Sequence, residues 1–181
     1  MVTLMDTDTG RILDLLEKLD LTENTLVIFT SDNGPWLSYG EHAGSSGKFR
    51  EGKGTVWEGG TRVPCIMRWP GKIPDGTVCD DMLMTLDLLP TFAGLAGAAL
   101  PTRAIDGHDI HPLLFGRPEA KSPWDEKGFC YYFGPQLQAV RSGPWKLYLP
   151  LENKLVALNG RRAPAPAVLY DVRHDVGEET E

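Results

Sequence analysis

Apolar residues near the start of the chain recur at the spacing of one helix face. Ile12, Leu13, Leu16 and Leu19 keep this spacing, while charged side chains occupy positions between them. A stripe of this kind is typical of an amphipathic helix that buries one face. The pattern therefore predicts a helix over residues 8–19, capped by one of the polar residues at positions 6–8.

A continuous apolar run follows this helix. Residues 25–30 read Thr-Leu-Val-Ile-Phe-Thr, with little alternation between apolar and polar positions. Such a run predicts a strand covered on both faces, as in a parallel sheet. Helix, short loop and buried strand in this order indicate an α/β architecture, in which functional groups gather beyond the carboxyl ends of the strands. The tetrapeptide Ser31-Asp32-Asn33-Gly34 occupies that position.

The segment from residue 34 to residue 60 is rich in glycine and weakly patterned. Loops of this length inside a compact domain are usually functional or disordered. Tryptophans that favour an ordered, packed loop border or interrupt it, namely Trp36, Trp57 and Trp69. Beyond it, residues 62–69 predict a strand closed by a Pro-Gly turn. Residues 85–95 and 110–115 predict helices, and Pro90 marks a first turn or a kink in the former.

Short β-rich runs dominate the last third of the chain. Three such runs, with Gly-Pro turns between them, lie at residues 128–133, 137–141 and 145–149. They predict an antiparallel meander, to which residues 169–172 add a strand after a loop rich in proline, alanine and arginine at residues 159–167. We therefore expect the end of an α/β domain at residues 1–117 and a small antiparallel subdomain at residues 118–181.

Composition excludes several classes of protein. With 41% hydrophobic and 24% charged residues, the 181-residue chain is neither disordered nor fibrous. The net charge of −7 argues against a nucleic-acid partner, because sequence-independent binding needs a basic face. The apolar runs are too short to cross a bilayer, and the first residues do not resemble a secretory signal peptide. The three cysteines, Cys65, Cys79 and Cys130, leave one disulfide or none open.

Asp32 and Asn33 are the first candidates for chemistry. A carboxylate and an amide oxygen at the end of a strand suit a hard cation such as Ca²⁺ or Mg²⁺, which takes oxygen ligands. Two ligands do not complete a shell of about six, so further donors have to come from elsewhere. The alternative is that Asp-Asn-Gly only makes a turn, since all three residues favour turns.

The second candidate is Lys53, which lies between two glycines. Glycines let the backbone approach a ligand closely, and the ammonium supplies a point charge for an oxyanion. The phosphate-binding pattern GxxxxGK[ST] is absent, so this is not a nucleotide-binding loop of that kind. The alternative is a lysine on a flexible surface loop. Glu58 and Arg62, close behind, are placed to pair with each other and hold the loop.

The histidines give weaker signals. His42 lies in the glycine-rich loop, where it is placed either to contact substrate or act as a general acid, or simply to face solvent. The spacing of His108 and His111 permits one helix face, but no third ligand stands near them, so we expect a structural role.

Several separate motifs together resemble the sulfatase family, in its arylsulfatase A and N-acetylgalactosamine-6-sulfatase branch. The motifs are NTLVIFTSDNGP (residues 24–35), GKGTVWEGGTRVP (52–64), RWPG (68–71), DLLPT (87–91), DG (106–107), QAVRSG (138–143), WK (145–146) and LYD (169–171). Their order and spacing over nearly the whole chain make the resemblance specific, although each motif alone is weak.

The resemblance implies hydrolysis of a sulfate ester by an alkaline-phosphatase-like α/β fold. Asp32 and Asn33 match the family's late pair of ligands for Ca²⁺, or sometimes Mg²⁺, and Lys53 matches a lysine that contacts the sulfate. His42 falls in a loop that faces substrate in similar enzymes. The implied substrates are sulfated carbohydrates or aryl sulfates, and the implied locations are periplasmic, extracellular or lysosomal.

One departure from the family pattern concerns the nucleophile. Sulfatases use a formylglycine made from Cys or Ser in a C/S-x-P-x-R motif, and none of the three cysteines lies in that context. The earlier metal ligands are missing as well. We therefore expect the C-terminal portion of a sulfatase, inactive by itself, with the formylglycine upstream. The alternatives are a phosphodiesterase or phosphonate hydrolase of the same superfamily, and a non-catalytic carbohydrate-binding remnant.

Overall fold

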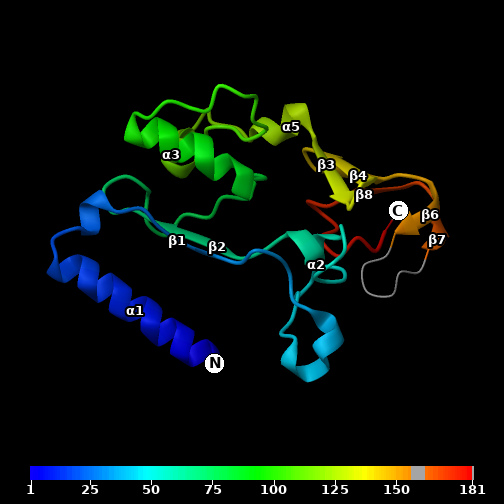
Figure 1. Ribbon diagram of the computed structural model, residues 1–181, viewed down its shortest axis with the longest axis horizontal. Helices are drawn as coiled ribbons and strands as arrows, with labels where there is room; N and C mark the ends of the chain where they lie inside the picture. The colour runs from blue at the N-terminus through cyan, green and yellow to red at the C-terminus, as the bar shows by residue number, and fades with distance from the viewer. Residues whose placement is uncertain (156–161, 181) are drawn as a thin grey trace.

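The computed structural model describes residues 1–155 and 162–180 (Figure 1). The α-helices are α1 (Val2–Lys18), α2 (Glu58–Thr61), α3 (Leu88–Ala96), α4 (His111–Leu114) and α5 (Pro123–Lys127), and the short 3-10 helices are η1 (Thr22–Asn24), η2 (Leu37–His42) and η3 (Thr85–Asp87). The strands are β1 (Val27–Thr30), β2 (Cys65–Arg68), β3 (Phe129–Phe133), β4 (Gln136–Ser142), β5 (Trp145–Tyr148), β6 (Leu151–Leu155), β7 (Arg162–Ala165) and β8 (Val168–Asp171).

The first helix, α1, is confirmed but begins six residues earlier than predicted. Met1 takes the cap position without a side-chain hydrogen bond, and the polar residues predicted to cap the helix lie inside it. The hydroxyl groups of Thr7 and Thr9 donate to the carbonyl oxygens of Thr3 and Met5, four residues back, so these polar side chains are accommodated within the helix. No residue of α1 is buried.

The first strand, β1, does not have the parallel neighbour that was expected. It pairs with β2 in an antiparallel two-stranded ribbon, with Val27 opposite Arg68 and Thr30 opposite Cys65. Its burial also falls short of the prediction, because Phe29 and Thr30 are exposed. The prediction of a parallel, doubly covered strand is therefore wrong for the described residues. An apolar run shows that a strand avoids water, but it does not reveal which strand lies beside it.

The predicted helices between the ribbon and the C-terminal sheet are confirmed. The segment predicted at 85–95 divides into η3 and α3, with Pro90 in the first turn of α3, where a missing N–H costs nothing. Gly97 ends α3 in a left-handed conformation, with φ of 65°. The segment predicted at 110–115 contains α4.

The predicted antiparallel meander is confirmed as a four-stranded sheet in the order β3-β4-β5-β8, with every neighbouring pair antiparallel. A second ribbon pairs β6 with β7. The prediction of a loop at residues 159–167 is therefore wrong in part, because residues 162–165 form β7. Residues 159–161 lie outside the described residues. The division of the chain near residue 117 stays a prediction.

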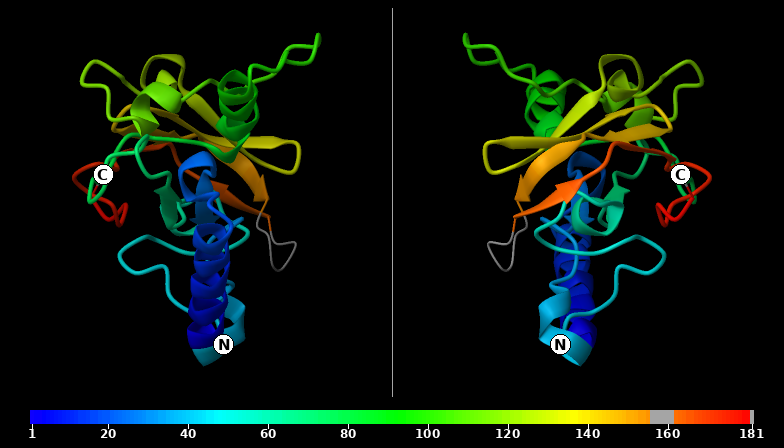
Figure 2. Two further views of the ribbon diagram at one scale, coloured as in Figure 1. Left: turned by 90° about the vertical axis from the view of Figure 1, so that its left-hand side faces the viewer. Right: turned by 90° about the vertical axis from the view of Figure 1, so that its right-hand side faces the viewer.

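The buried core lies on the four-stranded sheet. Its members come from all parts of the chain after residue 55 and are Val56, Met82, Trp124, Tyr131, Ala139, Tyr148, Tyr170 and Val172. Val56 brings the glycine-rich loop into this core. Figure 2 shows α1 extending away from the sheet, so the N-terminal helix and the core occupy different ends of the molecule.

A buried carboxylate connects the helical segment to the sheet side. Asp87 is fully buried and accepts hydrogen bonds from the backbone N–H groups of Met84 and His108 and from the indole N–H of Trp124, at 2.8 to 2.9 Å. Three donors compensate for the removal of this charge from water. The motif around Asp87 therefore has a structural role in this region.

The structure answers the question of a disulfide, which the sequence left open for the three cysteines. Cys65, Cys79 and Cys130 are separate, exposed thiols, so they form no disulfide with one another. Burial raises the pKa of the Cys65 thiol above its ordinary value. Within the described residues, no helix combines the length and apolar character needed to cross a membrane.

Candidate functional site

Two glycines bring the end of β1 against α2. The backbone N–H of Gly34 donates to the carbonyl oxygen of Gly60 at 3.1 Å. A Cβ atom at Gly34 would lie 1.8 Å from the carbonyl oxygen of Gly59. Only glycine permits this approach, so the DNGP and EGG motifs are complementary parts of one backbone contact.

A further backbone bond places Lys53 beside the same strand end. Its N–H donates to the carbonyl oxygen of Pro35 at 2.9 Å. Gly52, just before it, packs equally closely, because a Cβ there would lie 2.4 Å from that same oxygen. The two candidate motifs, about 20 residues apart in sequence, are therefore joined directly through their backbones.

Asp32, Asn33 and Lys53 line one cavity of about 970 Å³. Arg62 and Trp36 line it as well. No hydrogen bond or ion pair within residues 1–155 and 162–180 engages the Asp32 carboxylate, the Asn33 amide or the Lys53 ammonium. The cavity thus combines two unengaged oxygen donors with two cations, an arrangement suited to an anionic ligand held with a metal ion.

Aromatic side chains border the lysine. The Lys53 Nζ atom lies 5.3 Å from the centroid of the Trp36 ring, within the range of a cation–π interaction. Trp36 in turn packs edge-on against Tyr39, with ring centroids 4.8 Å apart. Both rings are substantially exposed. The loop therefore presents an aromatic surface next to the ammonium.

The histidines do not join this cavity. His42 is exposed at the end of η2 and is not among the residues that line it, so its contact with substrate stays a prediction. His111 pairs through Nδ1 with Asp109 at 2.8 Å, and the His108 ring lies 5.0 Å from Trp124. These contacts agree with the structural role expected for His108 and His111.

Asp32 and Asn33 are chemically suitable as two of the several ligands that a metal ion needs. Asp32 and Asn33 offer the oxygen atoms that Ca²⁺ and Mg²⁺ prefer, and both face the cavity. Within the described residues, no group of three or more His, Cys, Asp and Glu side chains could hold a metal ion. The donor set of the described residues is therefore suitable in kind but incomplete in number.

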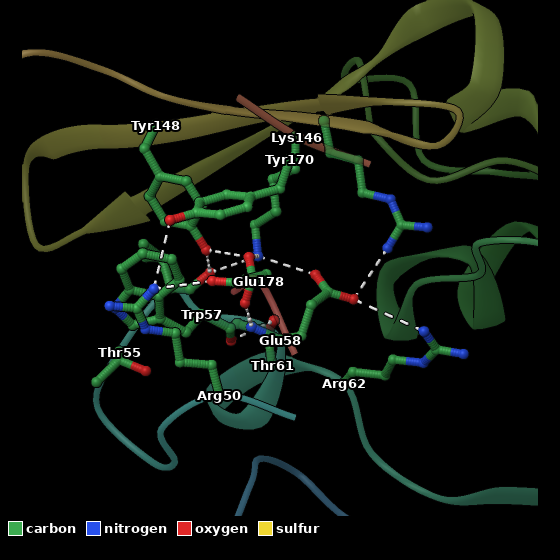
Figure 3. A network of polar contacts seen from close by, with 12 residues as sticks. Arg50, Thr55, Trp57, Glu58, Thr61, Arg62, Lys146, Tyr148, Tyr170 and Glu178 are labelled. Atoms are coloured by element: carbon green, nitrogen blue, oxygen red, sulfur yellow. Dashed lines mark hydrogen bonds and ion pairs between the residues drawn. The ribbon is translucent and has the colours of Figure 1, made fainter. Parts of the chain in front are cut away.

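A buried ionic cluster that the sequence did not predict surrounds Glu58, and Figure 3 shows its contacts. Glu58 lies 3.9 Å from Arg62, the partner considered from the sequence, but makes shorter contacts with Lys146 at 2.9 Å and Arg141 at 3.2 Å. These cations stand more than 80 residues away along the chain. The only signal for them was their position inside two of the motifs that carry the family resemblance.

Two tyrosines near this cluster have strongly perturbed acidity. Burial raises the pKa of the Tyr148 phenol, and the adjacent carboxylate of Glu178, which accepts its hydrogen bond at 2.5 Å, raises it further. Burial and the charge of Glu58 also raise the pKa of Tyr131. In the folded protein both phenols therefore stay protonated at pH values above the ordinary tyrosine pKa.

The fold and the cavity together define a mixed α/β protein in which oxygen donors and a lysine ammonium face the same space. A sequence profile of the sulfatase family matches residues 1–98, and the chain belongs to that family. Human arylsulfatase A is 38% identical over 187 residues, covering 96% of this chain and 36% of its own length. N-acetylgalactosamine-6-sulfatase of Canis lupus familiaris is 43% identical, covering 80% of this chain and 27% of its own length.

Solved structures agree with this assignment. The PsFucS1 sulfatase from Pseudoalteromonas sp. superposes with a TM-score of 0.84 at 30% identity, over 97% of this chain and 36% of that chain. Ps i-CgsB, in complex with k-i-k-neocarrahexaose, superposes with a TM-score of 0.79 at 29% identity. The match covers 100% of this chain and 37% of that chain. The predicted sulfatase fold is confirmed. The chain spans about a third of the length of the relatives that it matches.

Proposed function

We propose that this chain carries part of the active site of a sulfuric ester hydrolase. The observation that supports this most directly is the convergence of Asp32, Asn33 and Lys53 on one cavity, through the backbone bond from Lys53 to Pro35. The sulfatase family assignment supplies the reaction class. The competing superfamily and carbohydrate-binding alternatives have no observation in their favour.

In this proposal Lys53 binds the sulfate group and stabilises the charge that develops as the S–O bond breaks. Asp32 and Asn33 hold a Ca²⁺ ion, or Mg²⁺, together with ligands from outside this chain. The ion, when bound, neutralises charge on the sulfuryl oxygens. The nucleophile, expected to be a formylglycine, is not among these residues, so hydrolysis requires polypeptide beyond them.

The substrates are proposed to be sulfated sugars or aryl sulfates. Ps i-CgsB, one of the structural neighbours, was solved with a neocarrahexaose bound. The exposed rings of Trp36 and Tyr39 offer this chain an aromatic surface beside Lys53, on which either a sugar or an aryl group can stack. A location outside the cytoplasm, namely periplasmic, extracellular or lysosomal, follows from the family resemblance alone.

The test is hydrolysis of p-nitrophenyl sulfate. Two proteins are compared, the 181-residue chain and the product of the complete reading frame that contains it. We expect activity only from the second, and there Lys53→Ala should lower kcat/KM about 100-fold or more, because one stabilising charge at the reacting group is lost. Lys48→Ala is the matched control, since Lys48 is exposed and outside the cavity lining.

Three results would contradict the proposal. One is equal activity of Lys53→Ala and Lys48→Ala. Another is a preference of the longer protein for p-nitrophenyl phosphate or bis(p-nitrophenyl) phosphate, which would favour phosphoryl transfer. Glycan binding by the longer protein, without any hydrolysis, would favour the non-catalytic alternative.

A further inference from the structure

Three segments that are distant in sequence meet in a buried ionic cluster, which we define as Glu58, Arg141, Lys146 and Glu178. Glu58, Lys146 and Glu178 are at most 1% exposed. The Lys146 Nζ atom lies 2.9 Å from Oε1 of Glu58 and 3.3 Å from Oε1 of Glu178. Figure 3 shows this ammonium between the two carboxylates. Arg141 contacts the second oxygen of Glu58, so two carboxylates face two cations.

The sheet and the C-terminal tail supply three of the four members. Arg141 on β4 and Lys146 on β5 are cross-strand partners and therefore lie on the same face of the sheet. Glu178 comes from the tail after β8 and accepts hydrogen bonds from the Tyr148 hydroxyl and from the backbone N–H of Glu58. The fourth member, Glu58, is the first residue of α2, so the cluster attaches α2 to the sheet.

The attachment continues into the loop that carries Lys53. The Lys146 ammonium also donates to the carbonyl oxygen of Val56 at 2.7 Å. The N–H of Gly59 donates to the carbonyl oxygen of Arg50 at 2.8 Å, and the Thr55 hydroxyl donates to that of Gly52 at 2.9 Å. Residues 50–60 are thus bonded to the cluster at one end, and internal hydrogen bonds hold the segment as a closed loop. Lys53 lies inside this closed segment.

The cluster cannot contact a ligand in the cavity itself. None of its four members is among the residues that line the cavity, and their polar atoms contact one another, backbone groups and the side chains of Tyr148 and Arg62. A desolvated ionic cluster has few alternative arrangements, because any move that separates the charges leaves one unpaired away from water. Its influence on the cavity can therefore pass through the loop or through Arg62, which lines the cavity and lies 3.9 Å from Glu58. The loop is the tighter connection, because hydrogen bonds of 2.7 and 2.8 Å hold Val56 and Glu58 to the cluster.

We propose that Glu58, Lys146 and Glu178 are positioning residues that hold residues 50–60 on the antiparallel sheet and thereby aim Lys53 into the cavity shared with Asp32 and Asn33. The role of Lys53 in this statement rests on the proposed function. The C-terminal strands and tail, which contribute no residue to the cavity, then take part in the reaction by fixing the place of the sulfate-binding ammonium.

The first experiment is hydrogen–deuterium exchange on the product of the complete reading frame without substrate, comparing wild type with Glu58→Gln. We expect the amides of Lys53 and Gly59 to exchange at least about tenfold faster in the variant, because both bonds depend on the attached loop. Asp87→Asn is the matched control, since Asp87 is also a buried carboxylate but bonds to Met84, His108 and Trp124. It should leave these two amides within about twofold of wild type.

The second experiment is a double-mutant cycle on kcat/KM for p-nitrophenyl sulfate, in the product of the complete reading frame. Glu58→Gln should lower kcat/KM about tenfold alone, but less than about twofold in a Lys53→Ala background, because it acts through Lys53. A role in general stability would instead give the same loss in both backgrounds. If Glu58→Gln does not fold, Tyr148→Phe, which removes one hydrogen bond to Glu178, replaces it in both experiments.

The outcomes separate the two proposals. Unchanged exchange at Lys53 and Gly59 in a folded Glu58→Gln variant would overturn the positioning role, whatever the activity. Equal losses in both arms of the cycle would overturn it as well. If the wild-type protein hydrolyses no sulfate ester, the proposed function fails, and the exchange experiment alone decides whether the cluster holds the loop.

Discussion

Large apolar side chains on the N-terminal helix are exposed, whereas the core side chains on the C-terminal sheet are buried. On α1, several large apolar residues remain 51 to 61% exposed, namely Leu4, Met5, Ile12 and Leu15. On the sheet, Tyr131, Ala139, Tyr148 and Tyr170 are buried. An amphipathic pattern thus identifies the face that avoids water, but the element that covers this face has to come from elsewhere.

The charged residues show the same contrast. Arg11 and Asp8 on α1 form an ion pair at 3.0 Å with both side chains more than half exposed, whereas Lys146 and its two carboxylates are almost completely buried. Exposed pairs contribute little, because water and salt screen them. Buried pairs need all their partners, since an unpaired charge cannot return to water. The stability of this chain should therefore depend on the cluster and hardly on the helix surface.

The largest expected effect is that of Lys146→Met, which removes the central cation of the cluster. Glu178 would then lose its ion-pair partner and Glu58 its shortest ion pair, so the free energy of unfolding should fall by about 3–5 kcal/mol. The measurement is urea denaturation followed by circular dichroism. Arg11→Met, at the exposed pair on α1, is the control and should change stability by less than about 0.5 kcal/mol. Equal effects of the two substitutions would remove the contrast between the regions.

The second prediction compares two glycines. Gly34→Ala should lower the free energy of unfolding by about 3 kcal/mol, because its Cβ would collide with the carbonyl oxygen of Gly59. Gly10→Ala, in the middle of α1, meets no atom within 4 Å and should raise stability by about 0.5–1 kcal/mol, since alanine favours the helix. Thermal melts of both variants test the opposite signs. A stable Gly34→Ala protein would mean that the two motifs are not in close contact.

The sequence was informative wherever the interaction is local. The spacing of Ile12, Leu13, Leu16 and Leu19 predicts α1, and alternating β-rich runs with Gly-Pro turns predict the meander. The parallel, doubly covered arrangement predicted for β1 was wrong, because strand pairing is decided by residues far along the chain. Within the candidate site, Asp32, Asn33 and Lys53, which the family motifs predict as site residues, line the same cavity.

The supporting cluster was not recognised, for a physical reason. Glu58 has a plausible local partner in Arg62, four residues later, and nothing in the chain order shows that Lys146 and Arg141 come closer. Glu178 lies in a polar tail that resembles an ordinary solvated end. Charged residues normally lie at the surface, so only the three-dimensional arrangement shows that these are buried and paired.

The smallest effect concerns the alkaline limit of stability, which should also originate on the sheet side. The raised pKa of Tyr148 means that the folded protein retains a proton that the unfolded chain loses above its ordinary pKa of 10.0. This contribution is fully present below pH 10 and is lost as the pH rises further, at up to about 1.4 kcal/mol per pH unit. Tyr148→Phe should be destabilised by about 1 kcal/mol at pH 8, through its lost hydrogen bond to Glu178, but should lose stability less steeply between pH 10 and 11. Urea midpoints measured across this range give the slope of stability against pH. Tyr132→Phe, at an exposed ring, is the control. Parallel curves for wild type and Tyr148→Phe would show that this phenol does not couple folding to pH.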